Sequence, residues 1–477
     1  MKAVYLFLLS WLFTLLPFPS FSQSAIFPGF NRRTLTHDSQ IVPYHLFTPQ
    51  QTTGNQRYPL IVALHGVEML ASAENQWMNN NTVLKNYALG WTSPIVQNEY
   101  PAYVVAPHVH NGLSAHYGNW NTTQSLSLLN QLLDYLLENE SIDPNRIYLT
   151  GHSMGGIGTL RMPLLLTNRF AAYIPLSSAI SANNVTEIEQ GIHNYAYTAI
   201  WSFHQGQDTG NSNMRLVYNH FKNASYAPHY THNFGNEAIN LSASQITSLI
   251  RRHQRYFYTE YSYSCVQGAS CHTSVMDSAV VEPLLHQWLF RQYKIDPEAI
   301  MITAVDTEHD HRITWQAKNP QDSIEIWFKP DTTSDWTKVH QTTTIEGNSF
   351  DLATKVGQEQ ISPLSKVMLV VLNSDKFAYG LAQSSVENVP TALTNEITEA
   401  YFRVYPNPSQ AIINLDAPIN LAVTRPKYQI ISMVGKVVTE GILKTNRLSL
   451  QDLPKGVYLL KIQVGEQLLV KKIMKHN

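Results

Sequence analysis

Hydrophobic positions follow two different patterns along this chain. Up to about residue 294, short continuous apolar runs, such as those at 59–64 and 102–106, are separated by longer stretches with apolar residues at helical spacing. The clearest helical stretch is 122–138, in which leucines recur at positions 126, 129, 132, 133 and 136. Buried strands that alternate with helices predict a mainly parallel, doubly wound sheet with helices on both faces. We therefore predict an α/β domain over residues 23–294.

The same pattern predicts the individual elements of this domain. The expected strands are 44–49, at the edge of the sheet, and then 59–64, 102–106, 147–150, 170–176 and 199–203. The expected helices are 122–138, 156–166, 213–222 and 280–292.

Beyond residue 295 the pattern changes to short strands of alternating apolar and polar residues. We expect strands at 313–316, 323–328, 337–340 and 367–372. They predict a small all-β sandwich over residues 295–389 that is similar to a fibronectin type III module. A linker at 390–401 then leads to a second small sandwich at 402–477.

The charge balance argues against several classes of partner. Charged residues make up only 14% of the 477 residues, and the net charge is −2. Such a chain lacks the strongly basic surface that binds nucleic acid or anionic membranes. The acidic and histidine residues at 306–311 could bind a metal, but a solvated turn is the favoured interpretation because no other ligands are implied. We expect neither a metal ion nor an organic cofactor.

The first 22 residues have the pattern of a secretory signal peptide. Lys2 precedes an almost wholly apolar run from 4 to 18, and Ser20 and Ser22 place small residues at −3 and −1 before Gln23. No later segment approaches the roughly 18 consecutive apolar residues of a membrane-spanning helix, so we expect none in the mature protein.

The two cysteines, Cys265 and Cys271, lie in a stretch rich in Tyr, Ser and Gly. Disulfides persist in the compartments that exported proteins reach, so we expect a bond between these two. It would close a small loop and contribute on the order of 2 kcal/mol of stability. Zinc binding is disfavoured because a zinc site needs about four ligands.

The candidate nucleophile is Ser153, in the segment Gly151-His152-Ser153-Met154-Gly155. This segment matches Gly-x-Ser-x-Gly and lies between a predicted strand and a predicted helix, which is the context that a nucleophile elbow requires. The turn is strained and closely packed, so a Cβ on either flanking glycine would clash. The alternative is a chance match in a loop, which the strand–turn–helix context disfavours.

The candidate oxyanion hole consists of two backbone N–H groups. One belongs to Met154, which follows the nucleophile at the start of the helix. The other is the N–H of Val67, which follows His65 and Gly66 after an early strand, where this fold places a donor loop. A plain strand-to-loop glycine is the alternative interpretation of Gly66.

The candidate acid and base follow the serine in chain order. Asp208 comes after the predicted strand 199–203, and His272 lies in a predicted loop, 268–276, before the last helix of the domain. The order Ser153, Asp208, His272 is that of a Ser…Asp…His triad in an α/β-hydrolase. Asp277 is a rival acid, and His204 is expected to be structural, packed beneath the turn that carries Asp208.

These segments together resemble a known family. Residues 41–294 are similar to the secreted α/β-hydrolase esterases that include feruloyl esterases, acetylxylan esterases and polyhydroxyalkanoate depolymerases. The resemblance is carried by 59–66, 143–156, 203–204 with Asp208, and 271–272 with 288–290. It implies an α/β-hydrolase fold and ester hydrolysis.

The end of the chain resembles a second family. Residues 402–477 are similar to the C-terminal sorting domain of type IX secretion substrates, through 405–408, 428–431, 434–438, 453–458 and 470–473. The resemblance implies that the type IX machinery is a partner. It also implies export through the periplasm of a Gram-negative bacterium, with the protein released or attached to the cell surface.

The sequence therefore predicts an exported serine esterase that hydrolyses carboxylic esters through an acyl-enzyme. The expected substrates are acyl or feruloyl esters on plant polysaccharide. Two alternatives stay open: a serine peptidase of the same fold, and a cell-surface binding protein whose hydrolase domain is inactive.

Overall fold

The computed structural model of the chain describes residues in each of the three predicted folded domains, with gaps. The described residues are 29–37, 40–50, 56–67, 86–109, 119–208, 211–223, 229–230, 241–261, 269–306, 311–331, 334–343, 345–362, 364–386, 403–405, 407, 409–416, 426–432, 436–464 and 467–476. The predicted signal peptide 1–22 and linker 390–401 lie outside them. The chain divides into two compact units, Met1–Thr303 with Thr314–Phe350 and Ser365–Gln383, and Ala304–Ile313 with Asp351–Leu364 and Ser384–Asn477.

The first unit contains a nine-stranded sheet with the order β1-β2-β4-β3-β5-β6-β7-β9-β8. From β4 to β8 in this order all neighbouring strands pair in parallel, whereas β1 with β2 and β2 with β4 are antiparallel. The predicted mainly parallel sheet is confirmed. The strands are β1 Phe30–His37, β2 Gln40–Phe47, β3 Tyr58–Leu64, β4 Tyr103–Pro107, β5 Ile142–His152, β6 Ala172–Leu176, β7 Ile200–Gln205, β8 His229–Tyr230 and β9 Tyr256–Tyr261.

The prediction of an edge strand at 44–49 is wrong. That segment belongs to β2, which lies between β1 and β4. In the true edge strand, β1, exposed and half-buried residues follow the buried Phe30, and they include Asn31, Arg32 and Arg33. Its apolar signal is too weak to find from the pattern of hydrophobic positions.

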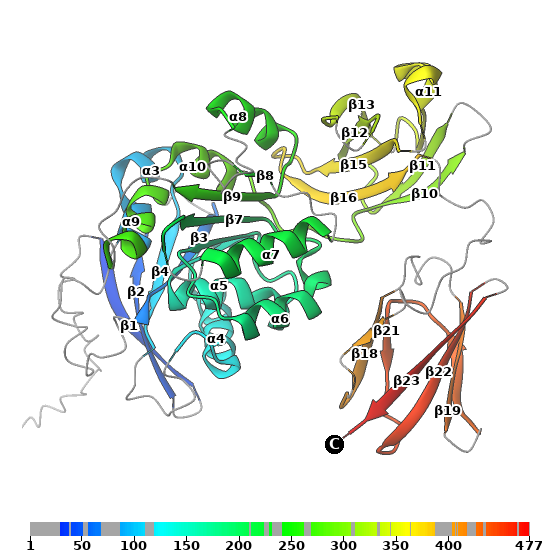
Figure 1. The fold of residues 1–477 in the computed structure, drawn as a ribbon, viewed down its shortest axis with the longest axis horizontal. Coiled ribbons are helices and arrows are strands. Elements are labelled where there is room, and N and C mark those ends of the chain that lie inside the picture. The colour runs from blue at the N-terminus through cyan, green and yellow to red at the C-terminus, as the bar shows by residue number, and fades with distance from the viewer. Residues whose placement is uncertain are drawn as a thin grey trace, which may run out of the picture. The chain divides into compact units, whose positions relative to one another are not determined.

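Helices cover both faces of the sheet (Figure 1). Alternate side chains of a strand point to opposite faces, so β3 supplies Leu60 and Val62 to one buried cluster and Ile61 and Ala63 to the other. The first cluster includes side chains of α4 to α7, and the second includes side chains of α8 to α10. The helices are α2 Asn86–Leu89, α3 Pro94–Glu99, α4 Thr123–Asn139, α5 Met154–Leu165, α6 Ala182–Gln190, α7 Asn211–Asn223, α8 Ala243–Arg251, α9 Ala269–Ala279 and α10 Pro283–Leu289, with short 3₁₀ turns at Gly90–Thr92 and Ile192–Tyr195.

The helix predicted at 280–292 is present but shorter than expected. It is α10, Pro283–Leu289, and a separate helix, α9, ends before it at Ala279. Glu282 caps α10 by accepting a hydrogen bond from the N–H of Leu284, and Pro283 is the first residue of that helix. Proline is well tolerated there because the first helical N–H has no partner inside the helix.

The chain after the α/β part forms small antiparallel sheets, as predicted. Four strands form one sheet in the order β13-β12-β15-β16, and three form another in the order β10-β11-β14. The predicted strands 313–316, 323–328, 337–340 and 367–372 fall in β11, β12, β13 and β15. The elements are β10 Ile300–Asp306, β11 Arg312–Ala317, β12 Ser323–Lys329, β13 Thr337–Thr343, β14 Ser349–Asp351, α11 Leu352–Val356, a 3₁₀ turn Gln358–Gln360, β15 Lys366–Leu372 and β16 Ala378–Ser385.

The C-terminal part contains two more small sheets, with the orders β17-β18-β21 and β20-β19-β22-β23. Both contribute to one buried cluster, in which Ile413 and Leu415 of β18 join Ile430 of β19 and Leu460 of β22. A second small sandwich is therefore present, while the predicted domain boundaries stay predictions. The strands are β17 Arg403–Tyr405, β18 Ile412–Asp416, β19 Lys427–Ser432, β20 Val437–Ile442, β21 Arg447–Ser449, β22 Gly456–Val464 and β23 Gln467–Lys475.

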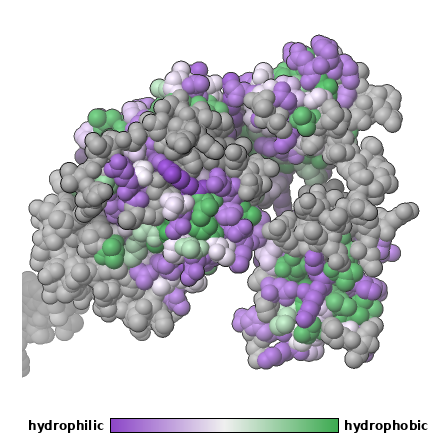
Figure 2. Space-filling view, viewed as in Figure 1, coloured by the Kyte–Doolittle hydropathy of each residue, from purple (hydrophilic) through white to green (hydrophobic). Residues whose placement is uncertain are grey.

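In the coloured part of the surface in view, hydrophilic and hydrophobic residues are interspersed (Figure 2). Among the described residues, no helix is both long and apolar enough to cross a membrane.

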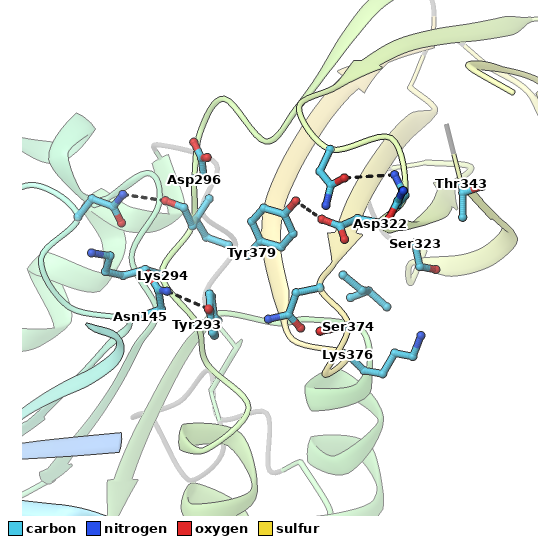
Figure 3. Close-up of a pocket in the computed structure, with 16 residues that line it drawn as sticks. Asn145, Tyr293, Lys294, Asp296, Asp322, Ser323, Thr343, Ser374, Lys376 and Tyr379 are labelled. Atoms are coloured by element: carbon cyan, nitrogen blue, oxygen red, sulfur yellow. Dashed lines mark hydrogen bonds between the residues drawn. The ribbon is translucent and has the colours of Figure 1, made fainter. Parts of the chain in front are cut away.

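A polar cavity of about 970 Å³ lies within the first unit, beside the four-stranded sheet (Figure 3). Its walls include Asn145 and Tyr293, whose amide and hydroxyl are hydrogen-bonded at 2.9 Å, and Tyr379, whose hydroxyl donates to Asp322. Asn145 lies near the start of β5, whereas Ser153 follows its end. Asn145, in the wall of the cavity, and Ser153 are therefore roughly 25 Å apart along β5, so the cavity and Ser153 lie at opposite ends of this strand.

A buried carboxylate joins the α/β part to the four-stranded sheet. Glu325 of β12 accepts hydrogen bonds from His253 at 2.9 Å and from Lys338 at 3.0 Å. Burial raises the pKa of this carboxyl, but the hydrogen bonds and charge interactions with His253 and Lys338 outweigh burial and lower the pKa to about 2.

We predict that Glu325→Gln destabilises the protein by about 2 kcal/mol near neutral pH, because it leaves His253 and Lys338 beside an uncharged amide. The folded-state pKa is depressed, so the stabilisation is present above the ordinary pKa of Glu and is lost as the pH falls towards about 2. Thermal melting from pH 7 to pH 2.5 should show the difference between wild type and variant shrinking with acidification. The exposed Glu359→Gln is the control, and a difference independent of pH would contradict the assignment.

Candidate active site

Ser153 occupies the turn between β5 and α5, with φ 57° and ψ −112°. A positive φ is rare for a residue with a Cβ and marks local strain, as the Gly-x-Ser-x-Gly pattern predicts. The turn is held by its backbone, because the Ser153 N–H donates to the Leu176 carbonyl at 3.0 Å and the Ser153 carbonyl accepts from Ile157 at 3.1 Å. The serine is 4% exposed, at the carboxyl edge of the sheet.

The glycines around Ser153 are required by close backbone contacts. A Cβ on Gly151 would lie 2.4 Å from the carbonyl oxygen of Gly155. A Cβ on Gly155 would lie 2.3 Å from the carbonyl oxygen of Leu64 and 2.8 Å from that of His65. Neither space admits a methyl group, so the turn packs directly on the end of β3.

Asp208 and His272 are hydrogen-bonded to each other. The Nδ1 of His272 lies 2.8 Å from Oδ2 of Asp208, whose side chain is almost fully buried. Asp208 follows β7, and the imidazole of His272 is about a quarter exposed. The carboxylate can only accept, so Nδ1 carries the hydrogen, and a neutral His272 has its Nε2 free to take a proton.

The predicted loop around His272 is wrong. His272 lies in the first turn of α9, and the buried side chains of Val275, Met276 and Ala279 recur at helical spacing along that helix. The Ser- and Gly-rich composition before it favoured a loop, but packing against the sheet fixes the helix. Asp277, the rival acid, lies on the exposed side of α9.

Two further histidines contact this pair. His152, the residue before Ser153, donates from Nε2 to the carbonyl of His272 at 3.0 Å, and the two rings lie 4.7 Å apart. The structure thus connects the Ser153 turn through His152 to α9, the helix that carries His272. His204, expected to be structural, is fully buried with its Nε2 3.5 Å from Oδ2 of Asp208. The order of residues in the sequence does not single out His152, because its partner is a backbone carbonyl, and every residue has one.

The two candidate oxyanion donors come from neighbouring segments. Met154 is the first residue of α5, where the N–H has no partner inside the helix. Val67 follows β3 and has a side chain that is 57% exposed. The packing of Gly155 against the carbonyls of Leu64 and His65 brings the two segments together.

Only one of the two cysteines of the expected disulfide lies within the described residues. Cys271 is disulfide-bonded. Its expected partner, Cys265, lies outside the described residues. Within the described ranges, no group of three or more His, Cys, Asp or Glu side chains could hold a metal ion.

Two family models match this chain. Residues 42–227 match the family described as "Putative esterase", and residues 403–476 match the one described as "Secretion system C-terminal sorting domain". The matches confirm both resemblances found in the sequence. Residues 42–227 of this chain are thus similar to an esterase family, and residues 403–476 are similar to a secretion sorting domain.

Known proteins with similar sequences match only part of this chain. The poly(3-hydroxyalkanoate) depolymerase C of Paucimonas lemoignei is 31% identical over 128 residues, which are 25% of this chain and 27% of that protein. The bifunctional acetylxylan esterase/xylanase XynS20E of Neocallimastix patriciarum is 27% identical over 135 residues, 28% of this chain and 17% of that protein. The chain thus spans no more than 27% of the length of these relatives. A solved structure of a thermostable esterase is 24% identical, with a TM-score of 0.39, and the match covers 56% of this chain and 64% of that one.

We predict that Gly155→Ala lowers stability by roughly 3 kcal/mol, because the new methyl group meets two carbonyl oxygens that cannot move without disrupting β3. The melting temperature should fall by about 6–12 °C. Gly347→Ala is the matched control, since a Cβ there meets nothing within 4 Å. Similar Tm values for both variants would show that the turn and β3 are not in close contact.

Proposed function

We propose that the chain is an exported serine hydrolase that cleaves carboxylic esters through an acyl-enzyme. Ser153 is the nucleophile, His272 the general base and Asp208 the acid that orients it. The observation that carries the proposal is the 2.8 Å hydrogen bond between His272 and Asp208 at the same sheet edge as the strained Ser153 turn. The esterase-family match over 42–227 supports it and includes Ser153 and Asp208.

The first half of the reaction acylates the enzyme. Nε2 of His272 takes the hydroxyl proton of Ser153 while Oγ attacks the ester carbonyl carbon, and the carbonyl electron pair moves onto oxygen. The N–H groups of Met154 and Val67 stabilise that oxyanion. When the intermediate collapses, the C–O bond to the alcohol breaks, and His272 gives its proton to the leaving alkoxide.

Water completes the cycle by the same route. His272 deprotonates the water as it attacks the acyl carbon, and collapse of the second tetrahedral intermediate releases the acid and returns the proton to Ser153. Asp208 keeps the hydrogen of His272 on Nδ1 and stabilises the imidazolium that forms in each half. Its burial strengthens this interaction, because little water screens the charge.

The proposed substrates are acyl or feruloyl esters carried by plant polysaccharide. Support comes from the relative named as an acetylxylan esterase/xylanase. The sorting domain at 403–476 supports export by a type IX secretion machinery of a Gram-negative bacterium, with release or attachment at the cell surface. A polymeric substrate outside the cell requires an exported enzyme.

We predict that a fluorophosphonate probe labels Ser153, as identified by mass spectrometry of the modified peptide. Ser153→Ala should abolish both labelling and hydrolysis of p-nitrophenyl acetate, because the attacking oxygen is gone. Ser127→Ala, an exposed serine on α4, is the matched control. Folded wild-type protein that takes no label would exclude the enzyme and favour the binding-protein alternative, and faster cleavage of peptide anilides than of esters would favour the peptidase.

We predict that Asp208→Asn lowers kcat by about 10³–10⁴-fold with little change in KM, because the amide no longer fixes the reactive tautomer of His272. Asp277→Asn changes an exposed residue of α9, the helix that carries His272, and its kcat should stay within about 2-fold of wild type. Steady-state kinetics on p-nitrophenyl acetate measure both. A larger loss in Asp277→Asn would transfer the acid role to that residue.

A further inference from the structure

His65, directly after β3, has both ring nitrogens in use. The backbone N–H of Val109 lies 3.1 Å from its Nε2, and its Nδ1 lies 2.8 Å from the carbonyl oxygen of Gly66. A backbone N–H can only donate, so Nε2 is the acceptor and carries no hydrogen. The hydrogen is therefore on Nδ1, which donates to the Gly66 carbonyl. The tautomer of His65 follows from its partners.

The ring is also fixed by its surroundings. His65 is 1% exposed, with the His108 ring at 4.8 Å and the Trp120 ring edge-on at 5.5 Å. These two side chains are buried as well. Rotation of the imidazole would break both hydrogen bonds inside a packed region, so the Nδ1–H direction is set by the fold.

The Gly66 carbonyl and the Val67 N–H belong to one peptide unit. In a planar trans peptide these two groups point in opposite directions. A hydrogen bond that holds the Gly66 carbonyl towards His65 therefore turns the Val67 N–H away from the imidazole. Glycine alone would let this peptide rotate, because it has no Cβ to restrict its dihedral angles.

We infer that His65 is a positioning residue that aims the Val67 N–H at the oxyanion. This inference rests on the proposed function and names the side chain on which one of its two donors depends. His65 touches neither the substrate nor Ser153 in this role and acts only through the Gly66–Val67 peptide. The contact of Gly155 with the His65 carbonyl keeps that peptide beside Met154, the other donor. Loss of one oriented oxyanion donor lowers kcat by about 10²–10³-fold in serine hydrolases.

Two substitutions separate the two hydrogen bonds of His65. In His65→Asn the amide nitrogen reaches roughly the position of Nδ1 and can still donate to Gly66. In His65→Gln the amide oxygen reaches roughly the position of Nε2 and can still accept from Val109, but the Gly66 bond is lost. We expect kcat on p-nitrophenyl acetate to fall about 100-fold in His65→Gln and less than about 10-fold in His65→Asn, with KM within about 3-fold in both.

A second variant tests the route through the N–H itself. Val67→Pro removes the donor, because proline has no backbone N–H. It should lower kcat about as much as His65→Gln, and the double variant should lose little more, because both changes remove the same interaction. Melting temperatures of all variants check that each protein is folded.

The outcomes separate the inference from the proposed function. If wild type is not labelled at Ser153, the proposed function fails whatever the variants do. If wild type is labelled and active, equal kcat in the Asn and Gln variants, or a better Gln variant, overturns the role of the Gly66 bond. Multiplying losses in the double variant would also overturn it, because His65 would then act by a route other than Val67.

Discussion

The contact between the Ser153 turn and the end of β3 is the constraint on which the rest of the candidate site depends. Gly155 lies so close to the carbonyls of Leu64 and His65 that no side chain fits between them. This approach sets the start of α5 against the segment that follows β3. It also leaves Ser153 with a positive φ, a strain that the surrounding sheet has to stabilise. Parallel pairing of β3 with β5, from Leu60↔Ile147 to Leu64↔Gly151, sets the register that places the carboxyl ends of these two strands side by side.

Buried histidines form a polar layer at this edge of an otherwise apolar sheet. His65 follows β3, His152 ends β5 and His204 lies in β7. A buried imidazole is costly unless its polar atoms have partners, and the polar contacts of these three differ: a carbonyl and an N–H for His65, the carbonyl of His272 for His152, and a 3.5 Å approach to the carboxylate of Asp208 for His204. Through them the end of β3 is linked to the segment after β4, and the end of β5 is linked to α9. These three histidines contact backbone atoms or the carboxylate of Asp208, and none of them is a group that reacts with the ester in the proposed mechanism.

The sequence predicted the parts whose signal is local. Apolar runs located the central strands β3 to β7, leucine spacing located α4, and the doubled glycine located the turn at Ser153. Chain order then selected Asp208 and His272 from many acidic residues and 19 histidines, and the two are hydrogen-bonded to each other. The remaining features depend on tertiary packing. The half-exposed β1 has too weak an apolar pattern to be found, α9 is stabilised by contacts that composition does not reveal, and the links made by His65 and His152 go to backbone atoms.

The exposed side chain of Val67 has a consequence for how such a site could diverge. In the proposed mechanism the N–H of this residue belongs to the chemistry, while its side chain is directed to solvent and is not used. The Gly66–Val67 peptide is oriented by the hydrogen bond from His65 to the Gly66 carbonyl, and the side chain of His65 is buried, unlike that of Val67. Position 67 is thus able to change its side chain, and with it the shape and polarity around an incoming ester, without altering the stabilisation of the oxyanion. Selectivity and reactivity are separable at a single residue.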